Sequence, residues 1–167
     1  LDVLRAVRSI DGVKKVFIRS GIRYDYLMAD PKADEFIEEL CKYHVSGTLK
    51  VAPEHASSKV LYYMRKPDAN IFLDFDRKYK ETNKKLYLIP YLISSHPGCG
   101  LREAAELAVF LKEYGFIPDQ VQDFYPTPGT LATCMYHTEL DPFTMKPVYV
   151  AKDMEEKKMQ RALMHYH

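Results

Sequence analysis

Side chains that can bind a small polar molecule follow four short apolar runs in this 167-residue chain. Arg23 follows the first run, Glu54 the second, Ser-Ser-His at 94–96 the third and Gln-Asp-Phe-Tyr at 122–125 the fourth. Arginine can grip a carboxylate with two hydrogen bonds, while carboxylates accept hydrogen bonds from hydroxyl groups. We therefore expect a ligand site. His96 is also a candidate acid or base, although no residue pattern identifies a reaction.

Each of these residues also has an ordinary structural alternative. Arg23 could pair at the surface with Asp25 or Asp30. Glu54 could cap the backbone amides of the serine turn that follows it. The glycine-rich turn over 94–100 could satisfy its own polar groups, or its glycines could let the backbone approach a ligand closely. The sequence leaves both interpretations open at each position.

A zinc site is a rival interpretation of part of the same set. His96 and Cys99 form one His/Cys pair, and Cys134 and His137 form another. Two such pairs make a permitted tetrahedral zinc set if their loops meet. Both pairs lie beside helix or turn signals that already account for them, so we treat this metal-stabilised module as an alternative.

The apolar runs predict the elements that would position these side chains. Buried strands are expected within 16–25, 48–55, 86–99 and 121–130, with amphipathic helical patterns between them, the clearest at 101–114. Such alternation predicts parallel pairing, which brings the carboxyl ends of the strands to one edge of the sheet, where ligands bind. The sequence thus predicts an α/β fold with about four parallel strands, outer helices and a C-terminal helical tail.

Local signals refine this prediction at several points. Pro90 lacks a backbone donor, so we expect a bulge or an early end to its strand. Beyond Thr130 the alternation of strands and helices is expected to stop, and the prolines within 141–147 indicate a loop or hairpin. Asp153 and Glu156 form a capping box, which predicts a last helix.

Composition limits the classes of partner. Lys and Arg number 24 against 23 Asp and Glu, which leaves no basic patch for nucleic acid. No apolar run approaches the roughly 20 residues that a membrane-spanning helix needs, and no signal peptide opens the chain. Three scattered cysteines give no disulfide framework. We expect a cytoplasmic protein with no membrane or nucleic-acid partner.

Four motifs carry a resemblance to a known family. The segment 52–67, Ala-Pro-Glu-His-Ala-Ser-Ser-Lys-Val-Leu-Tyr-Tyr-Met-Arg-Lys-Pro, resembles a signature found late in radical S-adenosylmethionine (SAM) barrels. The segment 20–25 resembles the preceding strand end of that superfamily. With Ser-Ser-His-Pro-Gly-Cys at 94–99 and the segment 122–130, the chain is similar over nearly its whole length to the YgiQ family of radical SAM proteins.

This resemblance implies a fold, cofactors and roles. The fold would be the trailing half of a partial (βα)6 TIM-like barrel over 1–130, with the start of a C-terminal accessory region over 131–167. The full-length parent would be an iron–sulfur oxidoreductase of unknown substrate that uses SAM and a [4Fe–4S] cluster. The residues expected to bind SAM are Arg23, Glu54, Ser95 and His96, and those expected to bind substrate are Gln122, Asp123 and Tyr125.

The cluster motif of radical SAM enzymes, Cys-x-x-x-Cys-x-x-Cys, is absent from the sequence. The cysteines are Cys41, Cys99 and Cys134, and no two of them have a local ligand spacing. We therefore expect a fragment that binds no cofactor and has no activity by itself. Its partners would be the missing N-terminal barrel half and the substrate, with possible dimer formation through an exposed strand edge. The alternative function is a non-catalytic module that binds a small anion or a protein.

Overall fold

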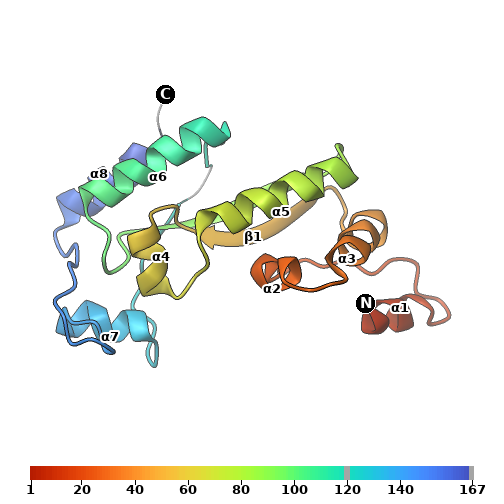
Figure 1. Cartoon of the computed structure of the whole chain (residues 1–167), viewed down its shortest axis with the longest axis horizontal. Helices are drawn as coiled ribbons and strands as arrows, with labels where there is room; N and C mark the ends of the chain where they lie inside the picture. The colour runs from red at the N-terminus through yellow and green to blue at the C-terminus, as the bar shows by residue number, and fades with distance from the viewer. Residues whose placement is uncertain (119–120, 166–167) are drawn as a thin grey trace. The chain divides into compact units, whose positions relative to one another are not determined.

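A parallel three-stranded sheet organises the chain in the computed structural model, which describes residues 1–118 and 121–165 (Figure 1). The strand order is β1-β2-β3, with β1 at Thr48–Glu54, β2 at Tyr87–Ser94 and β3 at Gln122–Asp123. Ile93 of β2 lies opposite Gln122, and Ser94 lies opposite Asp123. The predicted α/β class with parallel pairing is confirmed, and the sheet does not close into a barrel.

Helices precede, connect and follow the strands. They are α1 (Asp2–Arg8), α2 (Tyr24–Met28), α3 (Ala33–Glu39), the π-helix η1 (Leu40–His44), α4 (Ser58–Met64), α5 (Ala69–Thr82), α6 (Leu101–Tyr114), α7 (Leu131–Thr138) and α8 (Met154–Met164). Of these, α4, α5 and α6 form the connections between the strands. Within the ranges that the structure describes, no helix has the length and apolar character needed to cross a membrane.

The chain divides into two compact units. The first unit comprises residues 1–52 and 70–90, and the second comprises 53–69 and 91–167. The core of the first unit is aromatic: the ring of Tyr24 stacks on Phe75, 5.8 Å away between centroids, and Phe75 also contacts Tyr79. These three rings are almost fully buried, so this unit has an apolar centre of its own.

The strand predicted in the segment 16–25 does not form, so the described residues contain three strands of the expected four. The amide of Ile18 donates to the carbonyl of His44, but residues 13–19 are irregular. The apolar side chains there are not buried, and Phe17 is exposed. Because a strand is stabilised by a ladder and by the burial of one face, this apolar run alone was insufficient.

The bulge or early end predicted at Pro90 is also wrong, because β2 continues through Pro90 to Ser94. The Tyr87 amide donates to the carbonyl of Gly47, whereas the Ser94 carbonyl accepts from Phe124. Backbone N–H and C=O groups point to opposite sides in successive residues of a strand. In β2, the backbone groups of the even-numbered residues therefore point toward β3. Pairing with β3 involves Ile93 and Ser94, and therefore no ladder donor is required at Pro90.

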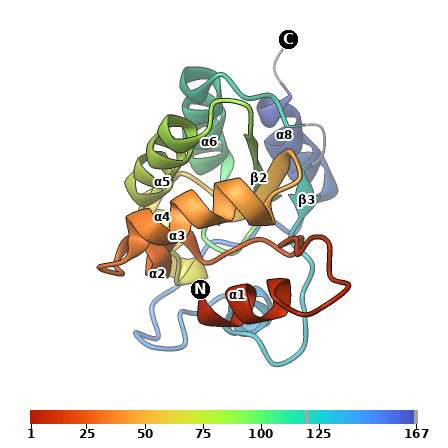
Figure 2. The same cartoon turned by 90° about the vertical axis from the view of Figure 1, so that its right-hand side faces the viewer.

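The second unit has an aliphatic core between α6 and α8, which lie against each other (Figure 2). Leu107 and Leu111 of α6, Met164 of α8 and Leu92 of β2 form one buried cluster. The predicted capping box of α8 is present in part: the Asp153 carboxylate accepts from the amide of Glu156. Through Met164, one face of α8 therefore packs against both α6 and β2.

The helix α7 was missed by the sequence analysis, which expected the alternation to stop after Thr130. The hydroxyl of Thr130 accepts from the amide of Thr133 and caps this helix. Of the loop or hairpin predicted over 141–147, the structure has the hairpin, because Leu140 and Pro147 form an antiparallel bridge.

Candidate functional site

A cleft of about 420 Å³ lies in the second unit, at the carboxyl ends of the three strands. It is lined by five residues predicted from the sequence, namely Glu54, His96, Gln122, Asp123 and Tyr125. The remaining walls are mainly apolar and aromatic, and come from the end of α4, from β2, from the segment that follows β3 and from the start of α7. We call this feature the strand-end cleft. Its position agrees with the rule that ligands bind at the carboxyl edge of parallel sheets.

Glu54 faces this cleft from the last position of β1. Its backbone is left-handed, with φ of 67°, and a carboxylate oxygen lies 3.1 Å from the ammonium group of Lys66. The structural alternative for Glu54 was to cap the serine turn, but His55 does this: its Nδ1 accepts from the Ser57 amide at 3.0 Å. The Glu54 carboxylate is therefore not needed to cap the turn, and it lines the cleft instead.

His96 lines the cleft although only 4% of its surface is exposed. Its Nδ1 lies 2.8 Å from the carbonyl oxygen of Pro97, which can only accept, so Nδ1 carries the proton. Burial lowers the pKa of His96 to about 4. The ring is thus neutral at pH 7, and its Nε2 atom has a free lone pair that makes it a hydrogen-bond acceptor.

Asp123 is held on both carboxylate oxygens. Oδ1 accepts from the hydroxyl of Ser94 at 2.5 Å, and Oδ2 pairs with the guanidinium of Arg161 at 2.6 Å. The carboxylate therefore joins β2, β3 and α8. These two contacts fix its position in the cleft wall, in contrast with Tyr125, of which 76% is exposed.

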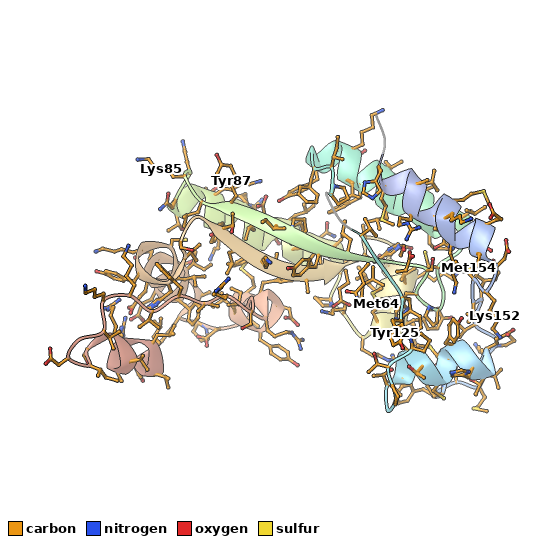
Figure 3. All side chains as sticks on the ribbon, turned by 180° about the vertical axis from the view of Figure 1, so that it is seen from behind. Met64, Lys85, Tyr87, Tyr125, Lys152 and Met154 are labelled. Atoms are coloured by element: carbon orange, nitrogen blue, oxygen red, sulfur yellow. The ribbon has the colours of Figure 1, made fainter. Side chains whose placement is uncertain are left out.

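The sequence analysis missed Arg65 as a functional candidate, although it lies within the radical SAM-like motif. It ends α4 in a left-handed conformation and lines the cleft. Its guanidinium lies 4.4 Å from the ring centroid of Phe143 and 3.8 Å from the carboxylate of Asp141. Met64, beside it, and Tyr125 also line this cleft (both are labelled in Figure 3). These contacts place a cation next to an apolar wall.

Ser95 and Arg23 do not line the strand-end cleft. Ser95 is buried behind its wall, and its amide donates to the side-chain oxygen of Gln160. Arg23 belongs to the first unit, where it pairs with Asp25 at 2.9 and 2.6 Å and stacks on Tyr26. The structural alternative for Arg23 is therefore present in the structure. The predicted roles of both residues in binding SAM stay predictions.

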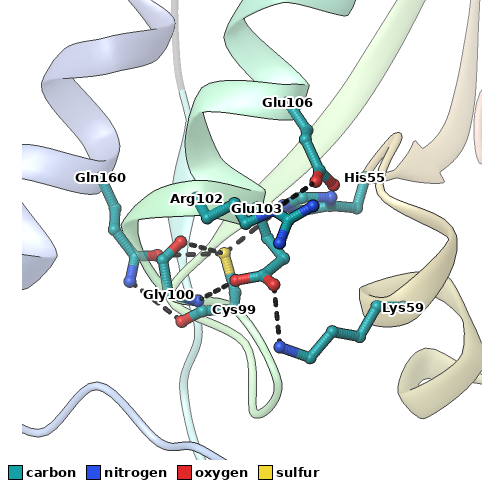
Figure 4. A network of polar contacts seen from close by, with 8 residues as sticks. All are labelled: His55, Lys59, Cys99, Gly100, Arg102, Glu103, Glu106 and Gln160. Carbon is teal, nitrogen blue, oxygen red and sulfur yellow. Dashed lines mark hydrogen bonds and ion pairs between the residues drawn. The ribbon is translucent and has the colours of Figure 1, made fainter.

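Both glycines of the turn between His96 and α6 contact other residues of the chain. A Cβ atom at Gly98, where φ is 91°, would lie 2.3 Å from the Tyr63 ring. At the start of α6, the Gly100 amide donates to Glu103, which also pairs with Lys59 (Figure 4). Burial raises the pKa of Glu103, but these hydrogen bonds outweigh it and leave that pKa below its usual value. The helix terminus is thus already neutralised by the chain's own carboxylate.

The zinc alternative finds no support in the geometry. The described part of the chain contains no group of three or more His, Cys, Asp or Glu side chains that could hold a metal ion. Cys99 is buried, and its thiol donates to Gln160 Oε1 at 3.1 Å, whereas Cys134 is exposed on α7. Burial raises the pKa of Cys99 to about 12, which disfavours the thiolate that zinc requires.

Comparison with known proteins adds relatives of much greater length. The chain is similar to UPF0313 proteins. One from Clostridium botulinum (strain Loch Maree / Type A3) is 58% identical over 170 residues, which cover 99% of this chain and 26% of that protein. One from Clostridium perfringens (strain SM101 / Type A) is 56% identical with the same coverage. The chain thus spans about a quarter of the length of these curated relatives.

A family model described as "Domain of unknown function (DUF3362)" matches residues 119–167. This range contains β3, α7 and α8. The predicted division of the chain at residue 130 into barrel fragment and accessory region stays a prediction.

Proposed function

We propose that the strand-end cleft forms part of the SAM- and substrate-binding wall of a radical SAM iron–sulfur protein. The observation that carries this proposal is that Glu54, His96 and Asp123, which follow three different apolar runs, line one cleft at the carboxyl edge of a parallel sheet. The radical SAM-like motif at 52–67 supplies the first of these residues. UPF0313 is the family name for YgiQ-like proteins, so the similarity to these relatives agrees with the resemblance.

The residues of the cleft are compatible with SAM as a ligand. Its volume of about 420 Å³ falls within the usual range for small-molecule sites, about 300–1,000 Å³. The Glu54 carboxylate and the neutral His96 can accept hydrogen bonds from ribose hydroxyls or an amine. Phe124 and Met64 offer apolar surface to a purine, and Arg65 can attract a carboxylate. When bound with the cluster, SAM would supply the radical chemistry, while these residues bind and orient it.

The [4Fe–4S] cluster does not fit the residues of this chain. Cys41 and Cys99 are buried, Cys134 is exposed, and no metal-binding group of three side chains exists among the described residues. We propose that another part of the longer protein supplies the cluster. No step of the reaction is assigned to this chain beyond binding and orienting.

Calorimetry of SAM binding to the reconstituted full-length protein tests this proposal. The Glu54→Gln variant should weaken binding about tenfold, because a hydrogen bond to a charged group is worth about 1.5 kcal/mol. Glu106→Gln is a matched control, because Glu106 is also ion-paired, with Arg102, but lies on α6 outside the cleft. Equal affinity of the wild type and Glu54→Gln would contradict the assignment of Glu54.

A second candidate function is the non-catalytic binding of a small anion. It is favoured by Arg65, whose side chain lines the cleft and is 41% exposed, and whose ion pair with Asp141 is as long as 3.8 Å. Binding of inorganic phosphate that is lost in Arg65→Gln, without any binding of SAM, would favour this candidate over the first.

A further inference from the structure

The helix α8 contacts two strand ends that form the strand-end cleft, although it contributes no residue to the lining. We propose that α8 is the positioning element of this cleft, with Gln160 fixing the loop after β2 and Arg161 fixing β3. This assigns a role to the segment 119–167, whose family model carries no function. The inference rests on the proposed function only for the identity of the ligand.

Gln160 uses the hydrogen-bonding capacity of its amide fully. Its side chain is completely buried, and its oxygen accepts from the Ser95 amide and from the Cys99 thiol, both at 3.1 Å. Its nitrogen donates to the Cys99 carbonyl at 3.0 Å (Figure 4) and to Glu156 at 3.1 Å. An amide with two acceptor and two donor contacts has one permitted orientation. It therefore holds the segment from Ser95 to Cys99, which carries His96, at two points.

The loop that Gln160 holds needs such support. Ser95 has φ of 59°, a left-handed conformation that is unfavourable for a non-glycine residue. Its amide is nonetheless buried and bonded to Gln160. A strained residue persists where its surroundings fix it, and here the surroundings include α8. Release of this contact would let the backbone relax and move the adjacent His96.

Arg161 acts on the next strand. Its guanidinium pairs with Asp123 at 2.6 Å, and the other oxygen of that carboxylate accepts from Ser94. The Asp123 carboxylate thus joins β3 both to α8, through Arg161, and to β2, through Ser94. The strand β3 is two residues long, so its own ladder supplies little restraint. Arg161 compensates for this with a charge-assisted hydrogen bond.

The position of α8 itself is set by the core and not by these polar contacts. Met164, one turn beyond Gln160, is buried against Leu107 and Leu111 of α6. The polar contacts can therefore be removed while the helix stays packed, which makes the proposal testable.

Hydrogen–deuterium exchange of the full-length protein tests the positioning role without any ligand. In the Arg161→Met variant, the exchange rate in peptides covering 121–126 should increase about tenfold. In the Gln160→Leu variant, the same increase is expected in peptides covering 94–100. Lys158→Met is the matched control, because Lys158 is also ion-paired on α8 but contacts Glu155. Arg161→Lys keeps the charge and should restore most of the protection.

Met164→Ala separates positioning from general destabilisation. It removes core packing and should increase exchange in α6 as well as in the strand ends. If Arg161→Met and Gln160→Leu leave their peptides unchanged, or raise exchange in α6 to the same extent as Met164→Ala, the positioning role is wrong.

SAM affinity then tests whether this positioning matters for the cleft. Arg161→Met should weaken binding about tenfold in the wild-type background and have no effect in the Asp123→Asn background, because the two residues act as a pair. Equal losses in both backgrounds would overturn the proposal. If the wild-type protein binds no SAM at all, the proposed function fails, while the exchange experiment still decides the role of α8.

Discussion

Glu54 and His55 are neighbours in the sequence with different tasks in the structure. His55 is buried, accepts the Ser57 amide that starts α4 and approaches the Cys99 thiol with its other nitrogen. Glu54 lines the strand-end cleft and pairs with Lys66. Because His55 accepts the turn amide, the adjacent Glu54 carboxylate is available to a ligand.

Two of the buried histidines, His55 and His96, predict a dependence of stability on pH. Burial lowers the pKa of His55 to about 3 and that of His96 to about 4, from an unfolded value of 6.5. Each histidine stays neutral in the folded state but takes up a proton when the chain unfolds below pH 6.5. The free energy of unfolding should therefore be highest above pH 6.5 and fall by about 1 kcal/mol per pH unit for each histidine as the pH drops.

Urea denaturation at pH 7.5, 6.0 and 5.0 measures this effect before most carboxylates protonate. The variant His55→Gln, which keeps a side chain able to accept and donate, should show a shallower decline. A slope unchanged between pH 7.5 and 5.0 in the wild type would contradict the neutral, buried state of both rings.

At the scale of elements, the turn after β2 is shaped by Gly98 and Tyr63. A Cβ atom at Gly98 would meet the Tyr63 ring at 2.3 Å, and φ there is 91°. Gly98→Ala should lower the free energy of unfolding by about 3 kcal/mol, from backbone strain and from displacement of the ring. Because Tyr63 lines the cleft, ligand affinity should fall as well.

Gly129→Ala provides the control for Gly98→Ala. Gly129 also has a positive φ, of 80°, but a Cβ atom there would meet nothing within 4 Å. Its replacement should cost about 1 kcal/mol, from strain alone. Equal losses of stability in the two variants would show that the close approach of Tyr63 to Gly98 adds nothing to the cost of the Gly98→Ala substitution.

The same scale shows what the sequence could and could not predict. The helix α6 was predictable because its apolar spacing is regular and Gly115, with φ of 73°, ends it. The cleft was predictable from Glu54, His96 and Asp123 because parallel strands end at one edge. The apolar run at 16–18 has the composition of a strand but lacks a ladder, and composition carries no information about a partner.

The contacts of α8 could not be predicted for a different reason. Gln160 bonds to Ser95, 65 residues away, and Arg161 pairs with Asp123, 38 residues away. Helical or strand periodicity reports which face of an element is buried but not which distant polar group it meets. Arg65 was missed because its place in the cleft depends on the left-handed end of α4.

At the scale of the whole molecule, the chain consists of two units that each have a core, and it spans about a quarter of its curated relatives. The remaining barrel half as a partner, and pairing through a strand edge with a second copy, stay predictions. The described residues of the second unit form the strand-end cleft and contain no group of three His, Cys, Asp or Glu side chains that could hold a metal ion.

The arrangement of the cysteines gives a prediction for the full-length protein. Replacing Cys134, which is exposed, with Ser should leave the iron and sulfide content after anaerobic reconstitution unchanged. The isolated 167-residue chain, treated in parallel, should retain no stoichiometric iron. Loss of iron from the full-length Cys134→Ser protein would show that this chain provides a ligand after all.

Two neighbouring strands reach the cleft through a residue in the left-handed conformation, Glu54 at the end of β1 and Ser95 just after β2. Glycine would adopt this backbone without penalty. Selection for stability alone would therefore favour glycine at both positions. If related chains retain a carboxylate at position 54, that residue has been selected for binding and not for stability.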